Sequence, residues 1–271
     1  MKQTDYWNRF LRTGKVEDYL HYRADARQET AAAGNVRQHE SASYSASWRE
    51  GRQEDGRKME RLRVLGIVLK AEPIGEYDRR VVLLTRERGK ISAFARGARK
   101  PTSALLASTG PFTFGTFELY EGRSSYSVCE IMADSYFEEL RQDFEGAYYG
   151  MYFLELCDYC TRENNDEREI LKLLYQSLRA LTVKSLPRKL VRAVFEIKLI
   201  VMCGEFPGLP GTDWLPAAVY AVDFIVRTPV EKLYTFTLAD KALEELICIA
   251  KKYRAQCLPG EFKTLEILQT L

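Results

Sequence analysis

The spacing of apolar residues changes near Phe137 in this 271-residue chain. Between Leu62 and Phe137, short runs rich in Val, Ile, Phe and Tyr alternate with turn residues, which is typical of β-strands. After Phe137, apolar residues recur at intervals of three and four positions, which is typical of amphipathic helices. A chain that places a group of strands before a group of helices is expected to fold as an α+β protein.

Five strand-like runs, separated by turn residues, fill the first of these regions. They lie at Val64–Leu69, Arg80–Thr85, Ile91–Ala95, Phe112–Tyr120 and Tyr126–Ala133. A longer connection, from Gly97 to Gly110, separates the third run from the fourth. Five short sequential strands with one long break are typical of a small closed barrel, so we predict an OB-fold β-barrel over residues 62–137.

The region after the predicted barrel, residues 138–271, is predicted to be an α-helical domain. Its helical patterns lie at Phe144–Cys160, Glu167–Val183, Pro187–Cys203, Ala239–Arg254 and Phe262–Leu271. Residues 205–238 interrupt these patterns with several prolines and two runs of strand character, Tyr220–Val226 and Leu233–Thr237. We therefore predict a small β insertion at 205–238.

The first sixty residues have a different composition. Within residues 1–23, Trp7, Phe10 and Leu11 lie at helical spacing, which predicts a short helical segment. Residues 24–61 are rich in Ser, Ala, Gly, Arg, Gln and Glu and poor in aliphatic side chains, which is typical of a disordered linker. The sequence therefore predicts a partly disordered extension in front of the barrel.

Positive charge is concentrated in one part of the predicted barrel. The net charge of the chain is only +2, yet residues 79–100 hold eight Lys and Arg side chains against the single acid Glu87. These basic residues are Arg79, Arg80, Arg86, Arg88, Lys90, Arg96, Arg99 and Lys100. One interpretation is that they form the solvated face of a small barrel. The alternative is a nucleic-acid site, because a basic groove with aromatic side chains can hold single strands without sequence preference.

The position of these charges along the chain favours the nucleic-acid interpretation. A first group gathers at a predicted hairpin turn and comprises Arg86, Arg88 and Lys90. A second group lies in or beside a Gly/Pro loop and comprises Arg96, Arg99 and Lys100. Barrels of this kind use their loops to bind ligands. The aromatic residues available to stack on bases include Tyr77, Phe94 and Tyr126.

Residue types needed for catalysis are scarce. The only histidines, His21 and His39, lie in the N-terminal extension, and no Gly-rich nucleotide-binding motif occurs. Cys157-x-x-Cys160 lies in an apolar helical stretch without a second pair at metal spacing, so we interpret it as core thiols rather than a zinc site. We expect the six cysteines to be reduced and mostly buried. The sequence predicts a binding protein rather than an enzyme, with no catalytic residue, cofactor or metal.

The sequence carries no signal for export or membrane insertion. No window holds 18 consecutive apolar residues, and the opening MKQTDYWNRF has no apolar signal core. We therefore expect a cytoplasmic location.

Several stretches resemble the RecO family of bacterial DNA repair proteins. The longest is GIVLKAEPIGEYDRRVVLLTRERGKISAFARGARKP, at Gly66–Pro101. The others are PFTFGTFELYEGR at Pro111–Arg123, YFLELCDY at Tyr152–Tyr159, RAVFEIKLIVMCGEFP at Arg192–Pro207 and FKTLEILQTL at Phe262–Leu271. The resemblance covers about residues 62–271, and residues 1–23 resemble the short YqzL family.

The RecO resemblance implies a non-enzymatic mediator of DNA repair and homologous recombination, associated with the nucleoid. Such a protein binds and anneals single-stranded DNA and acts with RecR and with the C-terminal tail of single-stranded-DNA-binding protein. The eight basic residues of 79–100 are the matching DNA-binding candidates. The candidates for receiving an acidic tail are Arg188, Lys189, Arg192 and Lys198. Lys198 could instead pair with Glu196 or with a neighbouring helix.

The sequence departs from the family pattern at residues 205–238. Many RecO proteins carry a four-cysteine zinc module there, whereas this segment contains no cysteine, so we predict a metal-free insertion.

The alternative function is a non-catalytic OB-fold adaptor that binds acidic peptides or RNA. A nuclease is disfavoured, because no cluster of acids that could bind metal ions accompanies the basic segment.

Overall fold

The computed structural model describes residues 61–122, 125–211, 213–268 and 270. The predicted helical segment at 1–23 and all of the predicted linker before Arg61 lie outside the described residues. The division of the rest into domains at 62–137 and 138–271 stays a prediction.

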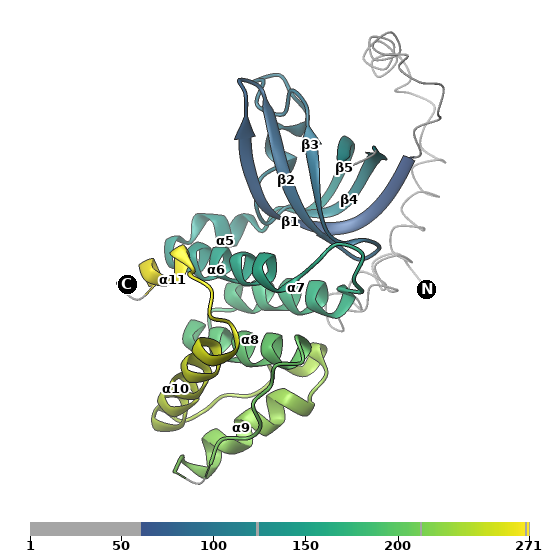
Figure 1. The fold of residues 1–271 in the computed structure, drawn as a ribbon. Helices are drawn as coiled ribbons and strands as arrows, with labels where there is room; N and C mark the ends of the chain where they lie inside the picture. The colour runs from purple at the N-terminus through teal and green to yellow at the C-terminus, as the bar shows by residue number, and fades with distance from the viewer. Residues whose placement is uncertain (1–60, 123–124, 212, 269, 271) are drawn as a thin grey trace, which may run out of the picture. The chain divides into compact units, whose positions relative to one another are not determined.

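The first third of the described chain is a closed five-stranded barrel in the order β1-β2-β3-β5-β4 (Figure 1). Its strands are β1 (Arg61–Ile74), β2 (Asp78–Thr85), β3 (Gly89–Ala95), β4 (Phe114–Glu121) and β5 (Tyr126–Ser135). A single short helix, α4 (Leu105–Ser108), lies in the long connection between β3 and β4. The prediction of an OB-like barrel followed by helices is therefore confirmed.

The long strand β1 closes the barrel because its two halves pair with different neighbours. Its first half pairs with β4 and its second half pairs with β2, and Gly66 and Ile67 pair with both. Just past this overlap, the register with β2 shifts between Val68 and Lys70. Such a bulge bends a strand and increases its twist, as barrel closure requires. Alternate residues point inward, and the barrel core includes Val81, Leu83 and Phe117, each fully buried.

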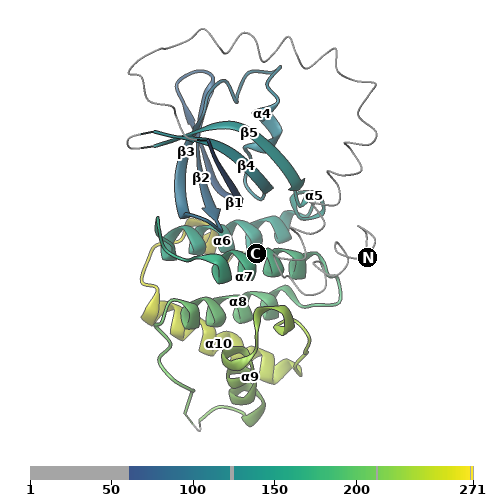
Figure 2. The ribbon, with the colours of Figure 1, turned by 90° about the vertical axis from the view of Figure 1, so that its right-hand side faces the viewer.

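The rest of the described chain is helical. The helices are α5 (Glu138–Gln142), α6 (Phe144–Cys160), α7 (Arg168–Thr182), α8 (Arg188–Met202), α9 (Pro216–Arg227), α10 (Asp240–Cys257) and α11 (Lys263–Leu268). The rings of Phe153 in α6 and Phe195 in α8 stack at 4.1 Å between centroids. Figures 1 and 2 show α6 and α7 next to the barrel, with α8, α9 and α10 beyond them.

The predicted β insertion at 205–238 is wrong, because the structure has helix α9 and a 3₁₀ turn at Val230–Lys232 in this segment. The run Tyr220–Val226, interpreted as a strand, lies inside α9. Pro216 stands in the first turn, where proline is favoured. The buried residues of α9 have the spacing of one helical face and are Ala218, Ala221, Val222 and Ile225.

The β2–β3 hairpin is joined to the loop between α6 and α7 by main-chain hydrogen bonds. The Lys90 N–H donates to the Arg162 carbonyl at 2.9 Å, and the Asn164 N–H donates to the Arg88 carbonyl at 2.9 Å. Gly89, between them, has a positive φ of 64°. A Cβ at this position would collide with the Arg162 carbonyl oxygen and lie 2.8 Å from that of Asn165. This end of the barrel is therefore covered by the helical region.

The cysteines are less buried than predicted. All six are free thiols, but only Cys157 is fully buried, while Cys129 and Cys248 are exposed. Cys160, the other half of the CxxC motif, is half-buried. Within the described residues, no group of three or more His, Cys, Asp or Glu side chains is arranged to hold a metal ion.

None of the described helices is both long enough and apolar enough to cross a membrane.

Candidate nucleic-acid interface

The structure separates the eight basic candidates of 79–100 into groups at opposite ends of the barrel. Because β2 and β3 pair as an antiparallel hairpin, Thr85 faces Gly89 at one end and Arg79 faces Ala95 at the other. The candidates at the hairpin turn are Arg86, Arg88 and Lys90. Those at or beyond the other end are Arg79, Arg80, Arg96, Arg99 and Lys100.

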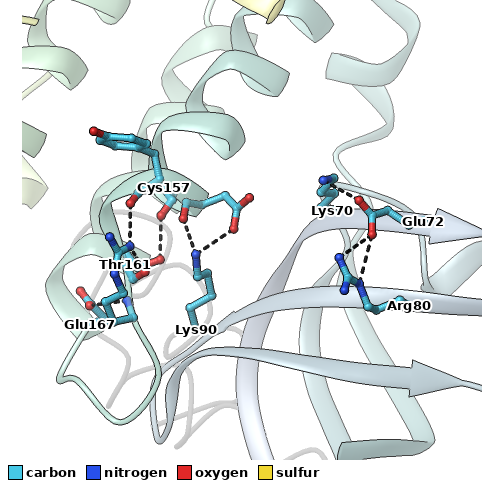
Figure 3. Close-up of polar contacts among 10 residues, drawn as sticks. Lys70, Glu72, Arg80, Lys90, Cys157, Thr161 and Glu167 are labelled. Atoms are coloured by element: carbon cyan, nitrogen blue, oxygen red, sulfur yellow. Dashed lines mark hydrogen bonds and ion pairs between the residues drawn. The ribbon is translucent and has the colours of Figure 1, made fainter. Parts of the chain in front are cut away.

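Each cation near the hairpin turn has an acidic partner within the protein. Arg86 forms an ion pair with Glu87 at 2.8 Å, and Arg88 forms one with Glu121 at 3.3 Å. Lys90 points from the barrel to α6, where its Nζ donates to the Asp158 Oδ1 atom at 3.0 Å and also to the Asp158 carbonyl (Figure 3). Arg86 pairs within the turn itself, whereas Arg88 joins the hairpin to β4 and Lys90 joins it to α6. Because this end of the barrel also lies against the loop between α6 and α7, these cations are poorly placed to receive a phosphate.

The opposite end of the barrel presents basic side chains that have no acidic partner among the described residues. We call Tyr77, Arg96, Arg99 and Lys100 the loop surface. The Arg99 Nη1 atom donates to the Gly75 carbonyl at 3.2 Å, and the Lys100 Nζ atom lies 5.6 Å from the centroid of the Tyr77 ring. The side chain of Tyr77 is 44% exposed. The loop surface therefore combines positive charge with an accessible aromatic ring.

The backbone of these loops is held in place by local hydrogen bonds. The Asp78 Oδ1 atom accepts from the Gly97 N–H at 2.7 Å, and the Arg99 N–H donates to the Tyr77 carbonyl at 2.8 Å. Gly97 has a positive φ of 65°, a conformation that glycine adopts without strain. The β1–β2 turn and the chain after β3 are thus fixed side by side.

The two remaining arginines of the segment have different surroundings. Arg79 is an internal anchor, because its Nη1 atom donates to Thr109 Oγ1 at 2.7 Å and to the Leu106 carbonyl at 2.9 Å. Arg80 is exposed on the outer face of β2 and pairs with Glu72 at 2.7 Å. In the strand register, Arg80 lies opposite Phe94, which is half-buried on β3.

Of the three aromatic residues considered for base stacking, two are accessible. Tyr77 is exposed and Phe94 is half-buried, but Tyr126 is only 7% exposed and belongs to the barrel core. The Tyr126 hydroxyl donates to Glu163 Oε1 at 3.1 Å, which joins the barrel to the loop after α6. The interpretation of Tyr126 as a stacking platform is therefore wrong.

Sequence reasoning missed an ion-pair cluster on the outer face of the barrel. Glu72 on β1 contacts both Arg80 and Lys70, the latter at 2.5 Å (Figure 3). The signal for this cluster is the period-2 spacing of Lys70 and Glu72, which places both side chains on one face of β1. The partner on β2 follows only from the strand register, in which Glu72 lies opposite Arg80.

The four basic candidates of the helical region are not equivalent. Arg188 pairs with Glu145 at 2.5 Å and also with Asp143. Arg192 pairs with Glu196 at 2.9 Å. Lys189 is exposed and has no ion pair within the described part of the chain.

Lys198 packs against a neighbouring helix, one of the two alternatives that the sequence left open. Its Nζ atom donates to the carbonyls of Ile225, Val226 and Thr228 at 3.1, 3.0 and 2.7 Å. These are carbonyls at the C-terminal end of α9, where helical acceptors lack backbone partners. Burial lowers the pKa of the Lys198 ammonium below its usual value. With three hydrogen bonds already made, this ammonium has no donor left for a peptide.

A groove of about 920 Å³ lies where α5, the start of α6, α7, α8 and α10 meet. Its apolar lining includes Leu140, Leu181, Leu186 and Leu243. Lys184, Arg188 and Lys189 supply its positive charge, and Glu139, Asp143 and Glu145 supply negative charge. Arg192 and Lys198 do not line this groove, so the structure brings together only two of the four basic candidates.

The fold defines a class of protein, namely an OB-like barrel with a basic loop surface joined to a helical region. Comparison with known families identifies which one. Residues 59–136 match the family model "Recombination protein O N terminal", and residues 141–211 match "Recombination protein O C terminal". Together the two matches take in more than half of the chain, which belongs to the RecO family.

The similar curated proteins carry the name DNA repair protein RecO. That of Acetivibrio thermocellus is 26% identical over 249 residues, which cover 79% of this chain and 98% of the relative. That of Clostridium novyi is 27% identical over 236 residues, covering 76% of this chain and 92% of the relative. That of Symbiobacterium thermophilum is 37% identical over 145 residues, which cover 53% of this chain and 57% of the relative.

Proposed function

We propose that this protein is a non-catalytic mediator of DNA repair and homologous recombination that binds single-stranded DNA and anneals complementary strands. The observation that supports DNA binding is the loop surface, where Arg96, Arg99 and Lys100 are exposed without acidic partners in the described chain and Lys100 lies over the exposed Tyr77 ring. Family membership and the name of the relatives support the role in repair. A DNA substrate would place the protein at the nucleoid.

Annealing by such a surface requires no bond to be broken. Cations that neutralise phosphates release condensed counterions from the strand, and this release drives binding. Neutralised strands repel one another less, so two complementary strands can approach and pair. Aromatic side chains such as Tyr77 add stacking that tolerates every base. The protein therefore contributes binding and juxtaposition.

We also propose that the groove between α5, α7, α8 and α10 receives the C-terminal tail of single-stranded-DNA-binding protein, and that the protein acts with RecR. The support is the lining of this groove, which combines leucines with Lys184 and Lys189, both exposed, and so suits an acidic peptide tail that carries apolar side chains. A labelled tail peptide should bind more weakly when Lys184 and Lys189 are changed to Ala. The same change at Lys251 and Lys252 of α10 is the control. Equal effects of the two double variants would reject this groove as the site.

The DNA site is tested by fluorescence anisotropy of a labelled single strand over a range of salt concentrations. The variant Arg96→Ala/Lys100→Ala removes two charges from the loop surface, and Arg86→Ala/Arg88→Ala removes two from the hairpin turn. We expect the loop variant to bind more weakly, with a salt slope shallower by about 1.4, because each single-strand phosphate contact contributes roughly 0.7. The hairpin variant should keep most of the native affinity and slope.

Two results would count against these proposals. Equal losses in both double variants would show that total charge matters rather than the loop surface. Failure of the folded native chain to bind any single strand would reject the DNA function and favour the adaptor that binds acidic peptides or RNA. Thermal unfolding of each variant establishes that the fold is intact.

A further inference from the structure

Glu72 lies between two basic side chains on the outer face of the barrel. Its Oε1 atom is 2.5 Å from Lys70 Nζ, and its Oε2 atom is 2.7 Å from Arg80 Nη2 and 3.1 Å from Arg80 Nε. Figure 3 shows both cations pointing toward this one carboxylate. Each oxygen thus contacts a different cation, as two phosphate oxygens would.

This cluster lies on the strands that lead to the loop surface. Arg80 is opposite Glu72 on one side and opposite Phe94 on the other, so the three residues form a row across β1, β2 and β3. The β1–β2 turn that carries Tyr77 begins directly after the end of β1 at Ile74. A strand bound at the loop surface and continuing over this face would meet Lys70 and Arg80 next.

Glu72 is ionised at neutral pH and accessible to solvent. The hydrogen bond from Lys70, together with the nearby charge of Arg80, lowers the pKa of the Glu72 carboxyl from its usual value. The side chains of Lys70, Arg80 and Glu72 are 53%, 44% and 33% exposed. Pairs of this exposure are weak and exchange readily with other ions. A phosphate group can therefore replace the carboxylate without opening the protein core.

We propose that Glu72 is an intramolecular competitor of DNA phosphate, which occupies Lys70 and Arg80 in the free protein and is displaced when a strand crosses the outer face of β1–β3. The proposal rests on the DNA-binding function proposed above. Its consequence is a moderated affinity, because the protein must give up two ion pairs for the phosphate contacts it gains. Such a moderate affinity for DNA helps a mediator that must release the strands after annealing.

The test compares Glu72→Gln with Glu118→Gln in single-strand binding at low salt. Both changes remove one negative charge from the outside of the barrel, but Glu118 on β4 pairs with Arg63 at 3.5 Å instead. The two carboxylates have similar exposures, 33% for Glu72 and 27% for Glu118. We expect Glu72→Gln to tighten binding about two- to fivefold, the range that exposed ion pairs contribute, and Glu118→Gln to change it less.

A second pair of variants assigns the effect to the two cations. In the background Lys70→Ala/Arg80→Ala, the gain from Glu72→Gln should vanish, because no cation remains to be released. Suppose that native protein binds DNA but that Glu72→Gln binds no more tightly than native protein, or no more tightly than Glu118→Gln. The competitor proposal is then overturned, while the DNA function stands. A gain that persists in the Lys70→Ala/Arg80→Ala background also overturns it. If neither native protein nor any variant binds, the DNA function itself fails.

Discussion

At the scale of single residues, Gly89 lies at a position where no side chain fits. Its φ of 64° is in the left-handed region, and a Cβ would collide with the Arg162 carbonyl oxygen. We expect Gly89→Ala to lower the free energy of unfolding by about 2–4 kcal/mol, since left-handed backbone alone costs roughly 1–2 kcal/mol for a non-glycine residue. Denaturant unfolding measures this loss.

Gly75→Ala is the control, because Gly75 also has a positive φ, 55°, but a Cβ there would meet no other atom within 4 Å. Equal losses in both variants would mean that the contact with the α6–α7 loop contributes little.

At the scale of secondary-structure elements, Lys198 of α8 fixes the C-terminal end of α9. Replacing it by Met preserves much of the side-chain volume but leaves the carbonyls of Ile225, Val226 and Thr228 without this donor. We expect Lys198→Met to destabilise the protein by about 1.5–3 kcal/mol, as for other buried hydrogen bonds to a charged group. Lys189→Met on the same helix should be nearly neutral, because Lys189 is exposed and has no ion pair within the described chain. Chemical unfolding of both variants compares their free energies of unfolding. An unchanged value for Lys198→Met would contradict the role of Lys198 in holding the C-terminal end of α9.

Elements were predictable from sequence where one face alone is buried. The barrel strands alternate between core and surface, as in β3, where Ile91, Ala93 and Ala95 are buried and the residues between them are not. Helix α9 was mistaken for a strand because Tyr220–Val226 is apolar at nearly every position, and such a run has no clear period. The proline at the start of α9 and the spacing from Ala218 to Ile225 were the helical signals.

At the scale of the whole molecule, sequence indicated that residues 79–100 are basic but not which of the cations are accessible. Accessibility depends on partners far along the chain, such as Glu121 for Arg88 and Asp158 for Lys90. These contacts arise only after the barrel has closed and has packed on α6. The sequence therefore located the basic segment, while strand register and tertiary packing decided which of its ends faces solvent.

The same packing predicts that barrel and helices unfold together, although the sequence suggested two domains. Lys90 bonds to Asp158 of α6, and the ring of Phe114 in β4 lies 4.7 Å from that of Tyr175 in α7. Leu84, which points away from the barrel core residue Leu83, is nevertheless fully buried. A barrel separated from the helices would expose these side chains to water, which disfavours a state with only one half folded.

Native-state hydrogen exchange measures this coupling. We expect the most protected amides of β2 and β3 to exchange with the same opening free energy as those of α6 and α7, because all of them require global unfolding. Lys90→Met should lower both values together by about 1–3 kcal/mol, since it removes a charged hydrogen-bonding partner at the junction. If the barrel amides exchange at a clearly lower free energy than the helical ones, the two halves are separate cooperative units. In that case the junction at Gly89 and Lys90 is a docking contact between domains rather than part of a shared core.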